Sequence, residues 1–387
     1  MSESQEPRPI PVFDVRLDED VVAAVADTLR SGWLTMGPRI QAFEAEFAEH
    51  LGVTHAVATS SCTSALHLAY LAAGIGPGDE VIVPGITFVA SAAAVRYCDA
   101  TPVLGEIRGQ HDLGLDPEDV AARITPRTKA VCAVHYGGYA APLTELRQLC
   151  EERGLTLIED AAHCPEAVLA GGEPGRKLGT YGQSGCFSFF SNKILSCGEG
   201  GLLATDDDGV AELARSRRSH AMTSGTWDRH RGHAMTYDVV EVGYNYRMDE
   251  PRAALLSARL PKLAADIARR RELTARYREL LADLDGVTLP YTDAEVEASS
   301  CYVMPVMVDP ELRDEVRSIL SERHKVQTSV LYPSINQFTA YGAGAESLPR
   351  CELAARTQVT LPLFPHLEEE SLERVVSSLT KALAEAG

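Results

Sequence analysis

Short apolar segments alternate with helical segments between about residues 55 and 205 of this 387-residue chain. Several apolar segments, such as EVIVP, AVCAVHY and LTLIED, carry hydrophobic residues at consecutive positions instead of at every second position. Such runs are typical of strands that are buried on both faces of a parallel sheet. The pattern predicts strands at residues 55–60, 80–84, 101–107, 130–136, 155–160 and 201–206.

Segments with helical periodicity lie between these strands and ahead of them. They predict helices at residues 18–32, 63–74, 90–98, 116–124 and 142–154. Residues 206–250 are polar, and we expect them to be irregular. The alternation of strands and helices indicates an α/β fold with a mainly parallel sheet.

The helical period returns from Pro251 to about Leu284, and we expect an interruption near Pro261 because proline disrupts a helix interior. Beyond it, the pattern predicts strands at residues 302–308, 326–333 and 359–363 and a last helix at 368–387. We therefore divide the chain into two parts: a large α/β domain at residues 15–250, and linking helices with a smaller C-terminal α/β domain at residues 251–387.

Composition narrows the functional classes. A net charge of −19 argues against a nucleic-acid partner or an anionic membrane surface. The N-terminus has no signal-peptide pattern, and no apolar run approaches the length of a membrane span. The nine cysteines are scattered and form no CxxC pair, so we expect reduced, mostly buried thiols in a cytoplasmic protein, and no metal.

The segment FSFFSNKILSCGEGG places Lys193 among aromatic and aliphatic residues, just before a glycine-rich turn. Most lysines are solvated surface charges, and that interpretation stays open for an isolated lysine. In a partly apolar pocket, however, desolvation lowers the pKa of the ammonium group. A neutral lysine amine is a nucleophile that can form a Schiff base with an aldehyde.

Asp160 ends the strand LTLIED, and the carboxyl ends of strands are where open α/β sheets bind ligands. An ionised carboxylate there could keep a pyridine nitrogen protonated, as pyridoxal phosphate requires. Asp160 could instead only cap the following helix. His163, three residues later, could contact the hydroxyl group of such a ring or could be structural.

Three further segments could hold a flat, phosphorylated cofactor. In SSCTSAL, Thr63 and the backbone of Cys62 lie at a helix N-terminus, which attracts anions, although simple capping explains the pattern equally well. Phe88 follows a strand and could stack on a ring or belong to the core. Ser188 lies five residues before Lys193, so both could reach one cofactor.

The segment from Ser216 to Tyr237 is locally basic in this acidic chain. Because guanidinium groups bind phosphate in a bidentate manner, Arg229, His230 and Arg231 are candidates for binding a diphosphate. The alternative is a solvated charged loop.

These motifs, in this order, resemble the DegT/DnrJ/EryC1/StrS family of pyridoxal-phosphate-dependent sugar aminotransferases, which have fold type I. The resemblance covers nearly the whole chain, through GWLTMGP, SSCTSALHLAY, VIVPGITFVASAAAV, LIEDAAH, FSFFSNKILSCGEGG, GYNYRMDEPRAALL and TLPLFP.

The resemblance implies a role for each matching residue. Lys193 is expected to bind the cofactor aldehyde and move a proton, Asp160 to pair with the ring nitrogen, and His163 to lie near the ring hydroxyl. Phe88 is expected to stack on the ring. Ser188, Thr63 and Cys62 are expected to bind the phosphate. Cys62 stands where the family usually has glycine, so only its backbone N–H is expected to matter.

The resemblance also implies an obligate homodimer, in which Asn245 reaches the phosphate of the neighbouring subunit. The expected reaction transfers an amino group from L-glutamate to a nucleotide-diphosphate keto sugar, in secondary-metabolite or glycan biosynthesis. The strings SGWLTMGP, CGEGG and GYNYRM look more like the subgroup that acts at C4 of a dTDP-4-keto-6-deoxyhexose, with Thr35 and Met36 near the sugar.

Other interpretations stay open. The substrate could be a 3-keto sugar or a keto-cyclitol such as an inosose, and the protein could be a cofactor-binding regulator without catalysis. Asn336 stands in a loop where many relatives carry a histidine, which leaves the substrate contacts of this loop undetermined.

Overall fold

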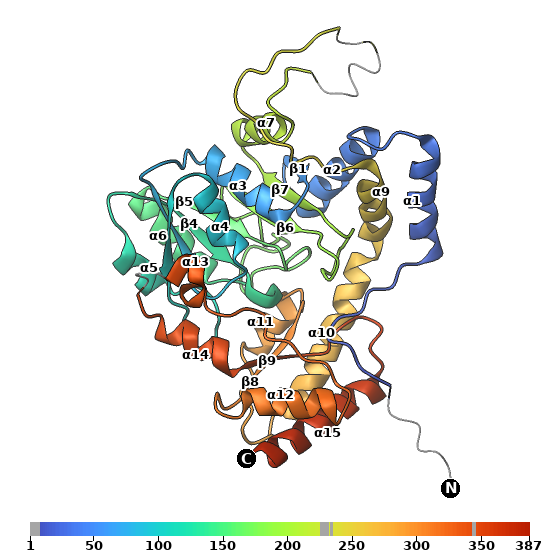
Figure 1. The fold of residues 1–387 in the computed structure, drawn as a ribbon, viewed down its shortest axis with the longest axis vertical. Coiled ribbons are helices and arrows are strands. Elements are labelled where there is room, and N and C mark those ends of the chain that lie inside the picture. Colours follow the sequence, from blue (N-terminus) through green and yellow to red (C-terminus); the bar gives the residue numbers. More distant parts are fainter. Residues whose placement is uncertain (1–7, 225–231, 233–234, 343–345) are drawn as a thin grey trace.

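The computed structural model describes residues 8–224, 232, 235–342 and 346–387. Figure 1 shows a central sheet flanked by helices, with a second group of helices and a short strand pair beside it. The elements that build the sheet layers are α1 (Glu19–Ser31), α2 (Pro38–Leu51), β1 (His55–Thr59), α3 (Cys62–Ala72), β2 (Glu80–Pro84), α4 (Ala90–Tyr97), β3 (Thr101–Gly105), α5 (Pro117–Arg123), β4 (Thr128–Val134), α6 (Leu143–Arg153), β5 (Thr156–Asp160), β6 (Ser184–Ser188), β7 (Gly201–Thr205) and α7 (Asp208–Arg217). The elements that follow are α9 (Glu250–Arg259), α10 (Leu263–Leu281), α11 (Asp293–Ala298), β8 (Met304–Met307), α12 (Arg313–Glu322), α13 (Thr339–Gly342), α14 (Pro349–Thr357), β9 (Gln358–Leu361) and α15 (Glu369–Ala386).

The sheet has seven strands in the order β1-β7-β6-β5-β4-β2-β3. Strands β2 to β6 pair in parallel, whereas β7 is antiparallel to both of its neighbours, β6 and β1. The prediction of a mainly parallel sheet is therefore confirmed. The ends of β1, β2, β4, β5 and β6 and the start of β7 consequently meet at one edge, which we call the carboxyl edge.

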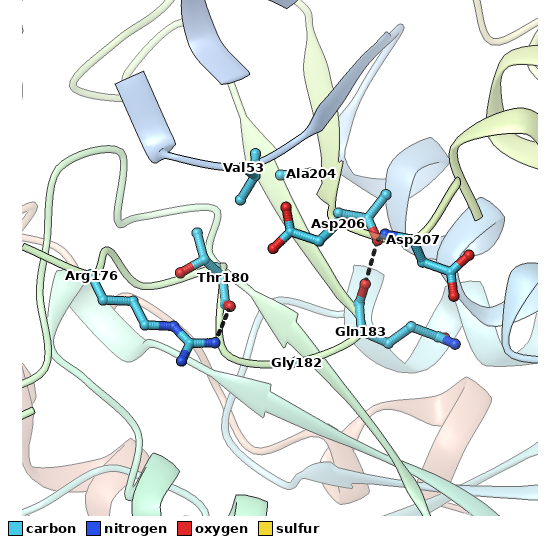
Figure 2. A pocket seen from close by; sticks show the side chains of 10 residues that line it. Val53, Arg176, Thr180, Gly182, Gln183, Ala204, Asp206 and Asp207 are labelled. Atoms are coloured by element: carbon cyan, nitrogen blue, oxygen red, sulfur yellow. Dashed lines mark hydrogen bonds between the residues drawn. The ribbon is translucent and has the colours of Figure 1, made fainter. Parts of the chain in front are cut away.

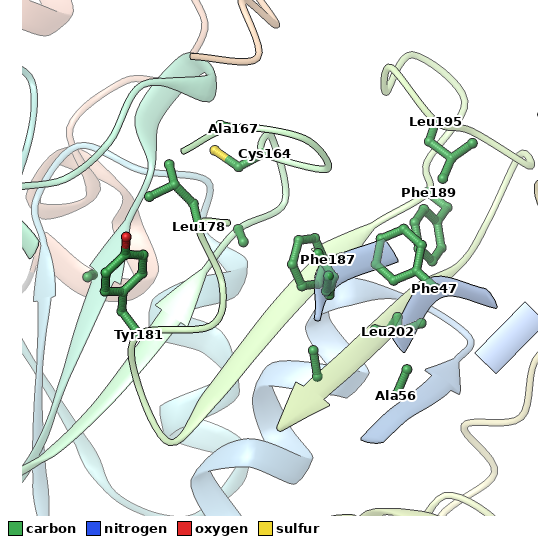
Figure 3. Packing of buried hydrophobic residues seen from close by; sticks show 14 of the residues in the cluster. Phe47, Ala56, Cys164, Ala167, Leu178, Tyr181, Phe187, Phe189, Leu195 and Leu202 are labelled. Atoms are coloured by element: carbon green, nitrogen blue, oxygen red, sulfur yellow. The ribbon is translucent and has the colours of Figure 1, made fainter. Parts of the chain in front are cut away.

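Both faces of the sheet are buried, as the continuous apolar runs predicted. On β4, Val131 and Ala133 pack in one core with α2 and α6, while Ala130 and Cys132 pack in another with α3, α4 and α7. Figure 3 shows part of the first core, where Phe47 of α2 meets Phe187 and Phe189. Because the side chains of a strand alternate, Glu159 and Asp160 point to opposite faces at the end of β5.

The C-terminal part is built around the antiparallel pair β8–β9, against which α10, α12 and α15 pack. It is reached through α9 and α10, and the expected interruption at Pro261 is a short 3-10 turn between them. Its core also includes Ile107 and Tyr136 from the sheet side. The division of the chain at residue 250 remains a prediction.

Some elements differ from the sequence prediction. Residues 206–250 are not irregular throughout, because Asp207 caps the N-terminus of α7 by accepting from the N–H groups of Gly209 and Val210. Residues 326–333 form isolated bridges at Val326 and Ser329 instead of a strand. The pattern also did not single out α2 or β6.

All nine cysteines are buried with free thiols. Within the part of the chain that the structure describes, no helix is both long enough and apolar enough to cross a membrane.

Candidate active site

Asp160 lies at the carboxyl edge, on the face of the sheet covered by α3 and α4. Its Oδ2 accepts a hydrogen bond of 2.8 Å from the Ser91 hydroxyl, and its Oδ1 accepts one of 3.2 Å from the Ala162 N–H. The Cys62 thiol lies 4.0 Å from Oδ1. Burial raises the pKa of Asp160, while the hydrogen bonds and the nearby Lys193 charge act against that rise. The site therefore presents a buried carboxylate with ordered partners.

His163 lies beside Asp160 and is held in one tautomer. Its Nδ1 accepts a hydrogen bond of 3.1 Å from the Gly137 N–H, so the ring proton is on Nε2. That Nε2 lies 3.1 Å from the hydroxyl oxygen of Tyr332 and donates to it. Burial lowers the pKa of His163 well below its ordinary value, and the charges of Lys193 and His135 lower it further. His163 is therefore a neutral hydrogen-bond donor.

Lys193 lies in the turn after β6, where its N–H donates to the Phe190 carbonyl at 2.8 Å. Figure 3 shows the neighbouring Phe189 and Leu195 in the core, which fixes the turn on both sides of the lysine. The ammonium nitrogen lies 4.6 Å from the ring centroid of Tyr302. Burial lowers the pKa of Lys193 to about 8, although Asp160 acts to raise it. A substantial fraction of this amine is therefore neutral near physiological pH.

The N-terminus of α3 provides a potential anion site at the same edge. Ser61 caps the helix by accepting from the Ser64 N–H at 3.1 Å, and the N–H groups of Cys62 and Thr63 have no acceptor within the helix. Such free N–H groups and the helix dipole favour an anion.

Ser188 is close to this helix N-terminus by strand register. Gly201 pairs with Ser188 on one side and with Thr59 on the other, two residues before Ser61. A Cβ atom at Gly201 would overlap the backbone of Ser61 and Cys62, so glycine is what permits this close approach. The structure thus brings Ser188 and the start of α3 together.

Phe88 lies after β2 with 54% of its side chain exposed, so it is not a core residue. Its ring centroid is 5.7 Å from that of Tyr332, which also contacts His163. Phe88 therefore has an exposed aromatic face at the carboxyl edge.

The remaining predicted residues lie outside the contacts described above. Asn245 is exposed, and its backbone forms a bridge with Ser219. Thr35 and Met36 are partly buried in the loop before α2. Arg229, His230 and Arg231 lie outside the described residues.

Sequence reasoning missed Ser91, Tyr302 and Tyr332. Ser91 lies in the apolar helix α4, where the sequence gives no indication that a small residue belongs to a functional site. Tyr302 and Tyr332 belong to the C-terminal part and reach His163 only through tertiary packing. Because no motif links residues so distant in the chain, only the structure could identify them.

A separate cavity of about 390 Å³ lies at the opposite edge of the sheet (Figure 2). It is lined by residues before β6 and after β7, including Gln183 and Asp206. In Figure 2 the Arg176 side chain donates to the Thr180 carbonyl. The Thr205 hydroxyl donates to the Gln183 carbonyl. None of the predicted site residues lines this cavity.

The carboxyl edge carries the chemical groups that pyridoxal phosphate needs. A lysine with lowered pKa suits its aldehyde, a buried carboxylate suits its ring nitrogen, and a helix N-terminus with a nearby serine suits its phosphate. Together with the mainly parallel sheet, this set defines a pyridoxal-phosphate-dependent enzyme of fold type I. The chain belongs to the DegT/DnrJ/EryC1/StrS aminotransferase family, whose family model matches residues 15–380. It is a pyridoxal-phosphate-dependent aminotransferase.

Known relatives cover nearly the whole chain. This chain is 37% identical over 372 residues to dTDP-4-dehydro-2,3,6-trideoxy-D-glucose 4-aminotransferase of Saccharopolyspora spinosa, and the match covers 95% of both chains. It is 38% identical over 392 residues to dTDP-3-amino-3,4,6-trideoxy-alpha-D-glucose transaminase of Streptomyces venezuelae, covering 98% of this chain and 97% of the relative. The solved structure of NtdA from Bacillus subtilis with bound cofactor PMP matches with a TM-score of 0.86 and 27% identity, covering 98% of this chain and 86% of that one.

Proposed function

We propose that the residues at the carboxyl edge hold the cofactor as the family resemblance implies. Asp160 pairs with the ring nitrogen, and its two hydrogen bonds support a fixed carboxylate orientation. Neutral His163 donates to the ring hydroxyl oxygen through Nε2, and Phe88 covers the ring. The N–H groups of Cys62 and Thr63, with the Ser188 hydroxyl, bind the phosphate.

The bound cofactor supplies an electron sink that stabilises negative charge on the carbon losing a proton. Lys193 moves that proton: its Nζ accepts it from the α-carbon of the amino donor, and the reverse transfer completes the exchange with the keto sugar. The lowered pKa supports this role, since a base works best when its pKa is near the working pH. Lys193 is partly buried, which limits the access of water to the proton.

We further propose that the acceptor is a nucleotide-diphosphate keto sugar, that the donor is L-glutamate, and that amination occurs at C4 of a dTDP-4-keto-6-deoxyhexose. The observation that carries the substrate class is the pair of full-length relatives whose names specify dTDP sugars. One of these names specifies amination at C4, whereas the other specifies a 3-amino sugar, so amination at C3 is a second candidate. Thr35 and Met36 lie near the sugar, and Arg229, His230 and Arg231 bind the diphosphate.

The test is incubation of the purified protein with L-glutamate and matched dTDP-linked 4-keto and 3-keto sugars, followed by mass spectrometry of the products. We expect the 4-keto sugar to gain an amino group, and the Lys193→Ala variant to form no product. Preferred amination of the 3-keto sugar would move the assignment to C3. Amination of a keto-cyclitol in place of both sugars would overturn the substrate class, and full turnover by Lys193→Ala would overturn the role of the lysine.

We also propose that the enzyme is a cytoplasmic homodimer. Nine buried free thiols suit a reducing compartment. Residues 235–242 form part of an arm that projects from the body beyond α7 (Figure 1). The arm exposes large apolar side chains, namely those of Met235, Tyr237, Val239, Val240 and Val242. Apolar side chains gathered on a surface favour a protein partner, and a second copy would place Asn245 at the neighbouring site.

A further inference from the structure

The Tyr302 ring contacts Lys193 and His163 of the candidate active site, although nothing in the sequence pointed to it. The residue lies two positions before the start of β8 and is 1% exposed. Its N–H donates to the Gly137 carbonyl at 3.1 Å, and its own carbonyl accepts from Arg270 Nη1 at 3.4 Å. The hydrogen bonds of its N–H and carbonyl groups therefore fix the position of the ring.

Three side chains meet this ring. The Lys193 Nζ lies 4.6 Å from its centroid. The His163 ring stacks at 4.3 Å with an interplanar angle of 21°, and the Phe13 ring stacks at 5.5 Å with an angle of 16°. An ammonium group within about 6 Å of an aromatic centroid is attracted by the negative face of the ring. Because Lys193 is partly buried, water screens this attraction less than it would at the surface.

Few other groups can hold the charge of Lys193. The groups that act on it are Asp160 at the end of β5, Cys62 at the start of α3, and Cys164 and His163 in the loop after β5. Burial raises the pKa of both thiols well above the ordinary value, so they stay neutral. His163 is neutral as well. Asp160 favours the Lys193 ammonium by its charge, but its hydrogen bonds go to Ser91 and Ala162 and not to the lysine. Burial also raises the pKa of Tyr302, which therefore acts through its π face and not as a phenolate.

We propose that Tyr302 is a positioning residue of the amino-transfer reaction: its ring holds the Lys193 ammonium whenever the lysine is not bonded to the cofactor. This inference rests on the proposed role of Lys193. During each turnover the substrate amine displaces the lysine, and a released lysine without a fixed position could turn away from the carbon that it must protonate. The ring keeps the released amine beside its proton acceptor, and the stacked His163 keeps the ring in place.

The test measures the pKa of Lys193 in cofactor-free protein that carries phenylalanine analogues at position 302. The pKa is taken from the pH dependence of Lys193 acetylation, followed by peptide mass spectrometry. Tyr302→Phe keeps the ring, so we expect the pKa to stay close to that of the wild type. Increasing fluorination of that phenylalanine weakens the negative face without altering the shape, so we expect the pKa to fall stepwise, by about one unit in all.

A matched fluorinated series at Tyr277, another fully buried tyrosine, is the control and should leave the pKa unchanged. A Lys193 pKa that does not change with fluorination at position 302 would overturn the proposal. In the holoenzyme, Tyr302→Leu should lower kcat about fivefold with little change in the KM for L-glutamate; a rise in KM alone would also contradict the proposal. Because the labelling experiment uses no sugar or amino donor, its result does not depend on whether the proposed substrate is correct.

Discussion

The Ser91 hydroxyl donates the shortest side-chain hydrogen bond to the Asp160 carboxylate, at 2.8 Å. Ser91→Ala removes this charge-assisted bond, so the pKa of Asp160 should rise further above its ordinary value. Activity requires the ionised carboxylate and is lost as the pH falls through this pKa. The acidic limb of kcat/KM should therefore move to higher pH, by about one to two units.

Ser184 provides the matched control for the pH profile. It is also buried, in β6, and its hydroxyl has no hydrogen-bond partner among the described residues. Ser184→Ala should therefore leave the profile of kcat/KM unchanged. Equal profiles for the two variants would show that Ser91 does not act through Asp160.

At the residue scale, the sequence could identify a group only when its chemistry stands out from its local surroundings. Lys193 is a charge inside an apolar segment, and Asp160 ends an apolar strand, so both could be predicted. Ser91 and Tyr302 are common residue types in ordinary positions. Their importance depends on which side chains the folded chain brings against them.

At the scale of elements, α2 is capped by a residue of another helix. Its N-cap residue is Gly37, which has no side chain to accept a hydrogen bond. Glu250 of α9 takes this role, since its two oxygens accept from the N–H groups of Arg39 and Ile40, each at 3.0 Å. Its own N–H donates to the Leu34 carbonyl, so it also holds the loop that contains Thr35.

Glu250→Gln replaces one acceptor with a donor and removes the charge that favours a helix N-terminus. We expect the free energy of unfolding to fall by about 1–3 kcal/mol, and the KM for the sugar to rise because the loop before α2 is released. Urea unfolding and steady-state kinetics measure the two effects. Glu46→Gln, at an exposed position of α2, should change neither. If Glu250→Gln is destabilised but its KM for the sugar is unaltered, the loop before α2 does not contribute to the substrate site.

The sequence predicted secondary-structure elements correctly where the local hydrophobic pattern and the tertiary packing agree. Buried strands such as β4 and β5 have continuous apolar runs because helices cover both sheet faces. Residues 326–333 carry strand-forming residues, yet Val326 bridges Ile10 and Ser329 bridges Thr360. Each bridge is isolated, so no ladder forms. Which segment lies beside a candidate strand cannot be inferred from its own composition.

At the scale of the whole molecule, each active site of the proposed dimer contains residues from both chains. Lys193 would come from one subunit and Asn245 from its neighbour. The Lys193→Ala and Asn245→Ala variants should each be inactive or nearly so on their own. A hybrid dimer of the two would contain one site with both residues intact and one site lacking both.

Mixing the two variants, dissociating them mildly and allowing them to reassociate should therefore restore activity. Random reassortment makes half of the dimers hybrid with one working site each, so we expect about a quarter of the wild-type activity. Mixing without dissociation is the control and should restore little. If activity stays absent although differently tagged variants co-purify as hybrid dimers, Asn245 serves its own subunit or neither. If the chains sediment as monomers while wild-type activity is full, the dimer is not needed for catalysis.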